Sequence, residues 1–383
     1  MPASETSGST PLKVVLKATD PTGLAKEIWV DDGRLKIALH RTLRVPEVKD
    51  KKAVFRYPPN FGPFPLFSVK QYADTLPPEI ASRGGLFLGM HERDALWIKL
   101  DHSNESPVHW YLLKIYAGGI NVITGKPPSK APAEDQDYVK VPGQGWVYGF
   151  AVAPGKSRQF VARPLGSGAT VEGQLTGKEL HGGIQIEILK APGFEIMLNS
   201  TYLPPITAVV QSQMMVHELQ QFICPWAQVS WFEDIRFHGG GKELESERTL
   251  ESYGIKKDTR DSCEMGAAAG GKIQQEIQRT GLKWDTNAVK TVLDIQILNS
   301  EVVERATGRR PLFKPPISMA QWVENRGRFD HVPTPTSEIH GRFEMVAEGD
   351  EEDEEEWQAH SGKWQEFMSF TVDEDEDDLV PTD

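Results

Sequence analysis

The sequence predicts an α+β, β-rich fold made mainly of antiparallel sheets, sandwich-like or barrel-like, with a few short helices and a disordered acidic tail. Three observations lead to this expectation. Apolar runs of strand length recur from residue 27 to residue 298, 34 Gly and 27 Pro punctuate the chain, and acidic residues concentrate at its C-terminal end. Short strands separated by turn residues are typical of antiparallel sheets.

Two hairpins are predicted in the first hundred residues. Ile28–Val30 and Leu35–Leu39 flank an Asp-Gly turn, a pattern that strongly indicates a hairpin. Gly85–Met90 and Ala95–Leu100 are apolar runs on either side of a charged turn, and we expect them to pair with each other. Further strands are expected at Val108–Ile115, Gly119–Ile123, Tyr138–Val141, Gly182–Ile188 and Val289–Ile297.

Short helices are predicted at four places. Ser68–Gln71 and Ser318–Gln321 have the capping-box spacing, in which a Ser hydroxyl and a Gln side chain bind opposite amides of the first turn. Ser212–Cys224 has apolar residues at helical spacing and is expected to end before the proline that follows. Ser300 is the predicted cap of a helix that ends at Gly308.

The chain is long enough for two domains or for one large β-rich domain. We expect a flexible N-terminus over residues 1–26, a β-rich domain over 27–238, an α+β second half over 249–345 and the tail over 346–383. A connector over 239–248 is predicted from three consecutive glycines and the charged run that follows them.

The net charge of −13 resides in the tail. Of the 55 acidic and 42 basic residues, 16 acidic residues and one Lys lie between Glu348 and Asp383, which leaves 39 acidic and 41 basic residues before them. The body is therefore nearly neutral and has no sequence-level footprint for nucleic acid or an anionic membrane. We predict neither as a partner.

Cysteine use and the N-terminus favour a cytoplasmic protein. Cys224 and Cys263 are too few for a disulfide framework and have no C-x-x-C spacing. The first residues show no signal-peptide pattern, and no run of about 18 apolar residues occurs. We expect neither a signal peptide nor a transmembrane segment.

The stretch with the most motifs runs from residue 158 to residue 188. Its segments are Arg158–Val161, Pro164–Gly168 (PLGSG), Val171–Glu172, Gln174–Gly177 (QLTG) and Gly182–Ile186 (GGIQI), and later ones are Ala268–Lys272, Trp284–Asp285, Ile297–Ser300 and Thr307–Gly308. In these segments the chain resembles an uncharacterised protein family of filamentous fungi and many bacteria. The resemblance covers most of residues 27–330, departs from the family pattern at Arg326–Phe329, and implies no activity, cofactor or catalytic residue.

A polar cluster within this stretch is the candidate binding site. Its members are Arg158, Gln159, Thr170, Glu172, Gln174 and Thr176. They lie near predicted strands and are interrupted by glycines, which let a backbone approach a ligand closely. The alternative is the outward face of a sheet with turn glycines between its strands, an arrangement that alternation alone predicts.

The remaining glycine-rich and histidine motifs lack the spacing of known catalytic or metal sites. Gly166–Gly168 followed by Gly173 suggests a phosphate-cradling loop, but no Rossmann, Walker or G-x-S-x-G sequence is present and no helix is predicted to open there, so we expect a turn or bulge. His181 and His238 lie beside glycine pairs without the spacing of a metal site, which favours turn and surface histidines. We predict no metal and no cofactor.

The tail has a clear physical signature. Glu351–Glu356 and Asp373–Asp378 repel each other and favour an extended chain. Trp357, Trp364 and Phe367 lie between them, an acidic-hydrophobic pattern suited to docking on a partner, a basic one included, or on a groove of the body. Two alternatives are that the tail only solubilises the chain and that it covers a basic surface of the body.

These patterns predict a non-catalytic binding or scaffold protein whose surface for an unknown protein or small-molecule ligand lies around residues 158–183. The chain shows glycine-rich strands but no nucleophile, metal or cofactor motif. The alternative is an enzyme of hydrolase or isomerase type, with a site assembled from separated residues and Glu172 or a histidine as acid/base.

Overall fold

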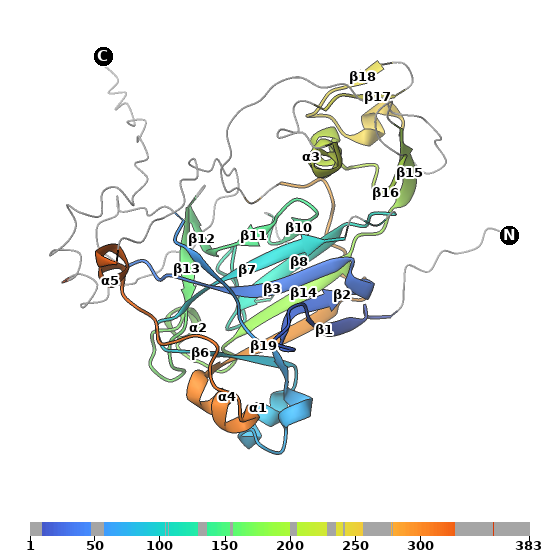
Figure 1. Cartoon of the computed structure of the whole chain (residues 1–383). Coiled ribbons are helices and arrows are strands. Elements are labelled where there is room, and N and C mark those ends of the chain that lie inside the picture. Colours follow the sequence, from blue (N-terminus) through green and yellow to red (C-terminus); the bar gives the residue numbers. More distant parts are fainter. Residues whose placement is uncertain are drawn as a thin grey trace, which may run out of the picture.

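The computed structural model describes residues 10–46, 57–103, 105, 107–128, 136–153, 156–199, 205–227, 235–239, 242–255, 277, 279–325 and 355. Within them, two large sheets pack against each other as a sandwich (Figure 1). The predicted β-rich, mainly antiparallel fold is confirmed, and the described strands form no closed barrel. The tail aromatics Trp357, Trp364 and Phe367 lie outside the described residues.

The eight-stranded sheet has the order β1-β2-β3-β7-β13-β12, with β4 on β3 and β11 on β7. Its strands are β1 (Val14–Ala18), β2 (Ala25–Val30), β3 (Leu35–Thr42), β4 (Asn60–Pro63), β7 (Ala95–His102), β11 (Trp146–Val147), β12 (Gly149–Ala153) and β13 (Lys156–Val161). The first predicted hairpin is confirmed as β2 and β3, joined by the 3-10 turn η1 (Asp31–Gly33). A flexible N-terminus was expected over residues 1–26, but β1 pairs with β2 and is part of the sheet. Residues 1–9 lie outside the described residues.

The seven-stranded sheet has the order β10-β8-β14-β19-β6-β5, with β9 on β8. Its strands are β5 (Phe67–Ser68), β6 (Leu86–Met90), β8 (Tyr111–Ala117), β9 (Ile120–Asn121), β10 (Val139–Val141), β14 (Ile184–Lys190) and β19 (Thr291–Asn299). β19 runs parallel to β6 and antiparallel to β14. A strand from the predicted second half of the chain therefore lies inside a sheet built by the first half.

The second predicted hairpin is wrong. β6 pairs with β5 and β19 in one sheet, whereas β7 pairs with β3, β13 and β11 in the other. Leu88 of β6 and Leu96 of β7 both belong to the core between the sheets. The turn between these strands thus carries the chain across the edge of the sandwich instead of reversing it within one sheet.

The helices follow the sequence in part. α5 (Met319–Glu324) begins with the predicted capping box, and Gly308 ends α4 (Ser300–Thr307) in the left-handed conformation. The cap of α4 is Asn299, one residue before the predicted Ser300. At Ser68 the predicted capping box is absent, because a 3-10 turn, η2 (Val69–Tyr72), follows without a side-chain cap.

Three further helices differ from the expectation. α1 (Pro78–Arg83) has a proline in its first turn, where the missing N–H is not needed. α2 (Val171–Thr176) opens beside the glycine-rich loop, where no helix is expected from the sequence. α3 (Val216–Ala227) continues beyond residue 224, where it was expected to end.

A second core lies on the outer face of β8. Trp110 and Leu112 pack there with residues of two small hairpins and of α3. The hairpins are β15 (Phe194–Leu198) with β16 (Ile206–Val210), and β17 (Phe237–Gly239) with β18 (Lys242–Leu244), followed by η4 (Leu250–Tyr253). A flexible connector was predicted over residues 239–248. That stretch instead contains β18, which pairs with β17 and contributes Leu244 to this core.

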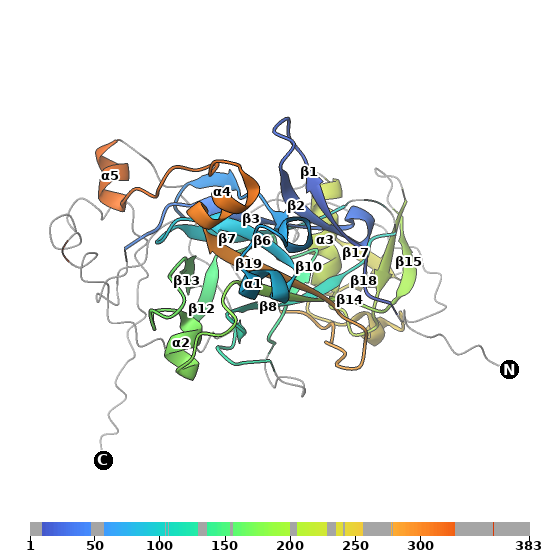
Figure 2. The ribbon, with the colours of Figure 1, turned by 90° about the horizontal axis from the view of Figure 1, so that it is seen from below.

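Figure 2 shows α2 beside β12 and β13, well away from α3 and its hairpins. No helix in the described ranges is long and apolar enough to cross a membrane.

Candidate functional site

The structure divides the six predicted site residues between two elements. Arg158 and Gln159 lie on β13, and the other four lie on α2 or at its N-cap. The Gln159 amide donates to the carbonyl of Leu43 at 3.0 Å and accepts from the N–H of Val45 at 2.8 Å. Gln159 therefore anchors the segment after β3, and a helix replaces the sheet face that alternation predicted for residues 170–176.

Glu172 organises the turn that follows α2. Its side chain is only 4% exposed. It accepts hydrogen bonds from the N–H groups of Leu180 (2.9 Å), His181 (3.0 Å) and Gly182 (3.0 Å), and its Oε1 lies 2.8 Å from Nδ1 of His181. Gly118 makes room for it, because a Cβ there would lie 2.8 Å from the Cβ of Glu172.

These contacts set the protonation of Glu172. Burial raises the pKa of its carboxyl, but the N–H of Gly182, the His181 ring and the N–H groups of Leu180 and His181 together lower it more. The pKa of Glu172 therefore lies below its ordinary value, and the group is a carboxylate at neutral pH.

Glu179 fills the glycine-rich loop. Its carboxylate accepts from the N–H groups of Gly166, Gly168 (3.2 Å) and Thr170 (3.1 Å) and from the Thr170 hydroxyl (2.5 Å). The same hydroxyl accepts from the N–H of Gly173 at 3.0 Å, which caps α2. The loop thus cradles an anion, as its glycines suggest, but the anion is a side chain of this protein.

The remaining predicted residues also bond locally. Nε2 of Gln174 donates to the carbonyl of Ala169 at 3.2 Å, and the Thr176 hydroxyl donates to the carbonyl of Glu172 at 2.7 Å. Arg158 is half-buried on β13, opposite Phe150. The polar groups of the α2 segment are therefore used largely to hold the segment itself.

Three leucines of this segment are exposed, and we call them the leucine surface. Leu165 is 50% exposed, Leu175 is 42% exposed and Leu180 is 68% exposed. Leu165 precedes the loop that Glu179 holds, Leu175 lies on α2, and Leu180 lies in the turn that Glu172 holds. The side chain of Leu165 also covers Gly182, where an added Cβ would lie 2.9 Å from it. Sequence reasoning missed these residues because it sought polar groups.

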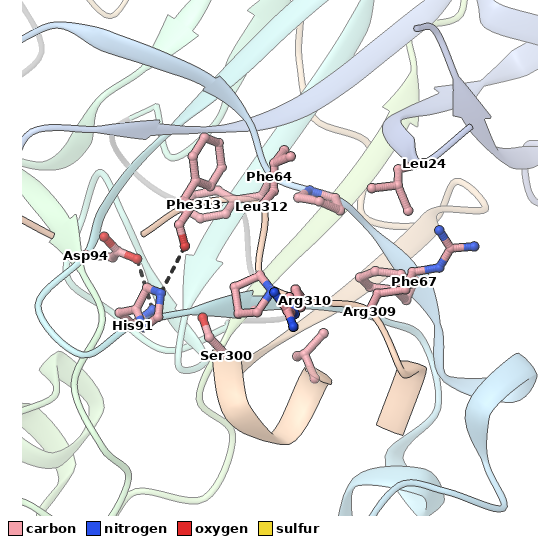
Figure 3. A pocket seen from close by; sticks show the side chains of 14 residues that line it. Leu24, Phe64, Phe67, His91, Asp94, Ser300, Arg309, Arg310, Leu312 and Phe313 are labelled. Carbon is pink, nitrogen blue, oxygen red and sulfur yellow. Dashed lines mark hydrogen bonds between the residues drawn. The ribbon is translucent and has the colours of Figure 1, made fainter. Parts of the chain in front are cut away.

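A separate pocket opens beside α4 (Figure 3). It is a shallow pocket that spans about 450 Å³ when the open space outside its mouth is counted. It is lined by residues of several segments: Leu24, Phe64, Pro65, Phe67, Gly89, His91, Asp94, Ser300, Val303 and Arg309–Phe313. Nε2 of His91 lies 3.2 Å from the carbonyl oxygen of Phe313. None of the six predicted site residues lines this pocket.

Asp94 is buried at this pocket with its charge compensated. It is 1% exposed, pairs with the guanidinium of Arg41 and accepts from the N–H of His91 at 2.9 Å. Because its carboxylate bonds the backbone of His91 and not the ring, this group lacks the arrangement of a Ser-His-Asp triad. In the part of the chain that the structure describes, no three His, Cys, Asp or Glu side chains gather to hold a metal ion.

Comparisons with known proteins do not identify a family or a function for this chain. No protein-family model and no curated protein matches the chain. Among solved structures, one match is a protein designed on the basis of ubiquitin, 26% identical over 21% of this chain and 93% of its own, with a TM-score of 0.18. A likeness of that size identifies neither the fold nor the function of the chain.

Proposed function

We propose that this chain is a non-catalytic binding protein and that the leucine surface contacts a partner protein. The observation that carries the proposal is the clustering of exposed apolar side chains in one segment. Of the ten large apolar side chains that are exposed in the described ranges, three belong to residues 165–180. Exposed apolar groups that gather in one place are a mark of interaction sites, whereas single ones are ordinary.

The rigidity of the segment supports the same proposal. Glu179 ties the loop at 166–170 to the turn after α2, and Glu172 ties that turn to α2 itself. The three leucines are thus held by a backbone that is ordered before any partner arrives. A surface that is ordered in advance loses less conformational entropy on binding, which favours affinity.

The chemistry of the surface favours a protein over a small polar ligand. Glu172 and Glu179 are already saturated with internal hydrogen bonds, so they offer little to a small molecule. Lys178 and His181 are exposed beside the leucines. The expected partner therefore presents apolar side chains with carboxylates around them.

The family resemblance and the cytoplasmic location remain proposals that accompany this one. The segments PLGSG and QLTG, which carry the resemblance, also build the leucine surface, because they contribute Leu165 and Leu175. If the chain is a member of that uncharacterised family, its shared motifs encode a contact surface and the scaffold under it.

The experiment compares partners recovered with wild-type and substituted chains. A tagged full chain is purified from its native cells beside the triple variant Leu165→Ser, Leu175→Ser and Leu180→Ser, and the co-purifying proteins are quantified. We expect one partner to be lost at least about tenfold, because each buried leucine contributes about 1.5 kcal/mol or more and about 1.4 kcal/mol is tenfold in affinity. The loss is then confirmed with the purified partner by titration calorimetry.

A matched control removes exposed apolar side chains elsewhere. Met197 and Val292 are 55% and 61% exposed and lie outside the segment. The variant Met197→Ser with Val292→Ser should recover the same partner as wild type. Equal recovery of every partner by wild type and by the leucine variant would refute the proposal.

One observation favours an enzyme as the second candidate. The Glu172 carboxylate orients the ring of His181, whose side chain is 64% exposed, and an oriented imidazole is one half of an acid/base site. Neither residue lines the pocket of Figure 3, where a substrate would be enclosed. A panel of ester, amide and phosphate substrates turned over by wild type and not by His181→Ala would establish this candidate in place of the first.

A further inference from the structure

The pocket beside α4 combines apolar walls with a basic rim (Figure 3). The walls include Leu24, Phe64, Phe67, Val303 and Leu312. Arg309 and Arg310 follow directly after Gly308, which ends α4, and both are exposed. This surface is distinct from the leucine surface, and the inference drawn from it does not rest on the proposed function.

The positive charge of this rim is not compensated by the described residues. Arg309 and Arg310 form no ion pair within the ranges that the structure describes, and neither does the exposed Lys314, which follows the pocket residue Phe313 in the chain. Among the described residues, the one carboxylate that lines the pocket belongs to Asp94, which is already paired with Arg41. An occupant with carboxylates and apolar side chains would therefore complement both the rim and the walls.

The chain itself contains a segment of this chemistry. Glu351–Glu356 are six consecutive acidic residues, and Trp357, Trp364 and Phe367 follow them closely. The acidic run matches the three cations, and the aromatic side chains match the apolar walls. A second acidic run, Asp373–Asp378, follows Phe370 in the same tail, so both junctions of acidic and aromatic residues lie there.

The tether to this segment has a suitable length and origin. Trp322 of α5 packs on Phe61 with ring centroids 5.5 Å apart, and Phe61 is three residues from the pocket residue Phe64, about 10 Å along a strand. Residues 326–350 then join α5 to the acidic run, and random-coil statistics give 25 residues an average span of about 25–30 Å. The pocket lies within easy reach, at an effective concentration of about millimolar.

We infer that this pocket is a binding site for an acidic, aromatic peptide and that its occupant is residues 351–367 of the same chain. The carboxylates of Glu351–Glu356 pair with Arg309, Arg310 and Lys314, and an aromatic side chain of the tail packs on the exposed side chain of Leu312 at the mouth of the pocket.

Zero-length cross-linking of the full chain tests this inference. A carbodiimide joins a lysine amine to a carboxylate only when the two are in contact, so Lys314 should become linked to Glu351–Glu356 in peptides identified by mass spectrometry. We expect these links to weaken in about 0.5 M salt, because the Debye length falls below about 5 Å there.

Two variants and one control make the result specific. Arg309→Glu with Arg310→Glu should reduce the links at least fivefold, and so should Trp357→Ala with Trp364→Ala and Phe367→Ala, which leaves every carboxylate and the folded body in place. Arg305→Glu reverses an exposed charge on α4 that does not line the pocket, and it should leave the links unchanged.

Three outcomes would overturn the inference. The first is the absence of Lys314 links in wild type, and the second is their persistence in both the arginine and the aromatic variants. The third comes from mixing ¹⁴N- and ¹⁵N-labelled chains: links between unlike chains would show that the tail of a second copy occupies the pocket. If the arginine variant loses its thermal transition, it is unfolded and its links are not interpreted. The links of the aromatic variant then test the inference.

Discussion

At the scale of single residues, two glutamates determine the shape of the candidate surface. Glu172 and Glu179 supply internal carboxylates to N–H groups that would otherwise be free to bind a ligand. Sequence reasoning identified Glu172 as important but assigned it to ligand binding. Its actual partners lie eight to ten residues further along the chain, and a local pattern gives no sign of such a fold-back.

Removal of the Glu172 carboxylate should destabilise the protein. Glu172→Ala leaves the N–H groups of Leu180, His181 and Gly182 without their acceptor, so we expect the free energy of unfolding in urea to fall by at least about 2 kcal/mol. The exposed Gln174→Ala on the same helix is the control, with an expected change within about 0.5 kcal/mol. Equal stabilities of the two variants would contradict this account.

The same residue predicts a pH dependence. Because folding lowers the pKa of Glu172, its carboxylate stabilises the folded chain above the ordinary glutamate pKa of about 4.3, and this contribution is lost as the pH falls through the folded-state value. The difference in unfolding free energy between wild type and Glu172→Gln should stay constant at about pH 6–8 and shrink below about pH 4.3. A difference that grows below about pH 4.3 would show that folding raises the pKa of Glu172 and would contradict this account.

A buried ion pair joins the sandwich to α3. Lys140 of β10 and Glu218 of α3 are 1% and 0% exposed, with Nζ 2.8 Å from Oε1. Burial raises the pKa of Glu218, but the Lys140 ammonium and the N–H of Met215 lower it more, so the group stays charged. Glu218→Ala should therefore cost about 3–5 kcal/mol, because it leaves Lys140 buried without a partner.

The double variant Lys140→Met with Glu218→Leu separates the charge from the packing. It removes both charges and keeps apolar volume, so we expect it to recover most of the stability lost by Glu218→Ala in urea denaturation. Arg236→Ala, which breaks the exposed pair with Glu243, is the control and should cost less than about 1 kcal/mol. If the double variant is as unstable as Glu218→Ala, the loss of stability does not come from the unpaired charge of Lys140.

At the scale of elements, the sequence predicts the strands better than their partners. β14 and β19 alternate apolar and polar residues, and the structure contains both. β6 and β7 are apolar without alternation, so nothing local shows to which sheet each belongs. α2 has two glycines in or beside its six residues and low intrinsic stability, so its cap at Thr170 and the tertiary bonds of Glu172 determine its formation.

The position of β19 depends on glycine at its neighbours. Gly183 has a φ of +62°, and a Cβ there would lie 2.4 Å from the carbonyl oxygen of Ile295. Gly183→Ala should cost about 2 kcal/mol or more, whereas Gly177→Ala, with a φ of +70° and open space around it, should cost only about 1 kcal/mol. Urea denaturation of the two variants measures both losses, and equal losses would show that the contact with β19 is unimportant.

At the scale of the whole molecule, the predicted halves share one sheet. β19 lies between β14 and β6, so a chain ending at residue 248 lacks a central strand and leaves the edges of both neighbours unpaired. We expect that chain to lose its cooperative thermal transition by circular dichroism, and a chain ending at residue 325 to keep it. A cooperative transition in the shorter chain would show that the first half folds independently.

The exposure of the leucine surface is also a property of the whole molecule. Leu165, Leu175 and Leu180 are apolar side chains, and the packing of loop, helix and turn leaves them in solvent. Composition and motif order predicted the fold class, and the proposed leucine surface lies within the stretch 158–183 that the motifs singled out. The residues that carry it depend on burial, which the sequence does not encode locally.

Hydrogen–deuterium exchange of the full chain, alone and with its co-purified partner, tests the central claim most directly. We predict that the partner slows exchange of the amides in residues 165–182 and leaves β17 and β18 unchanged. Added protection confined to other segments, with residues 165–182 exchanging as in the free chain, would contradict the assignment of the leucine surface as the partner site.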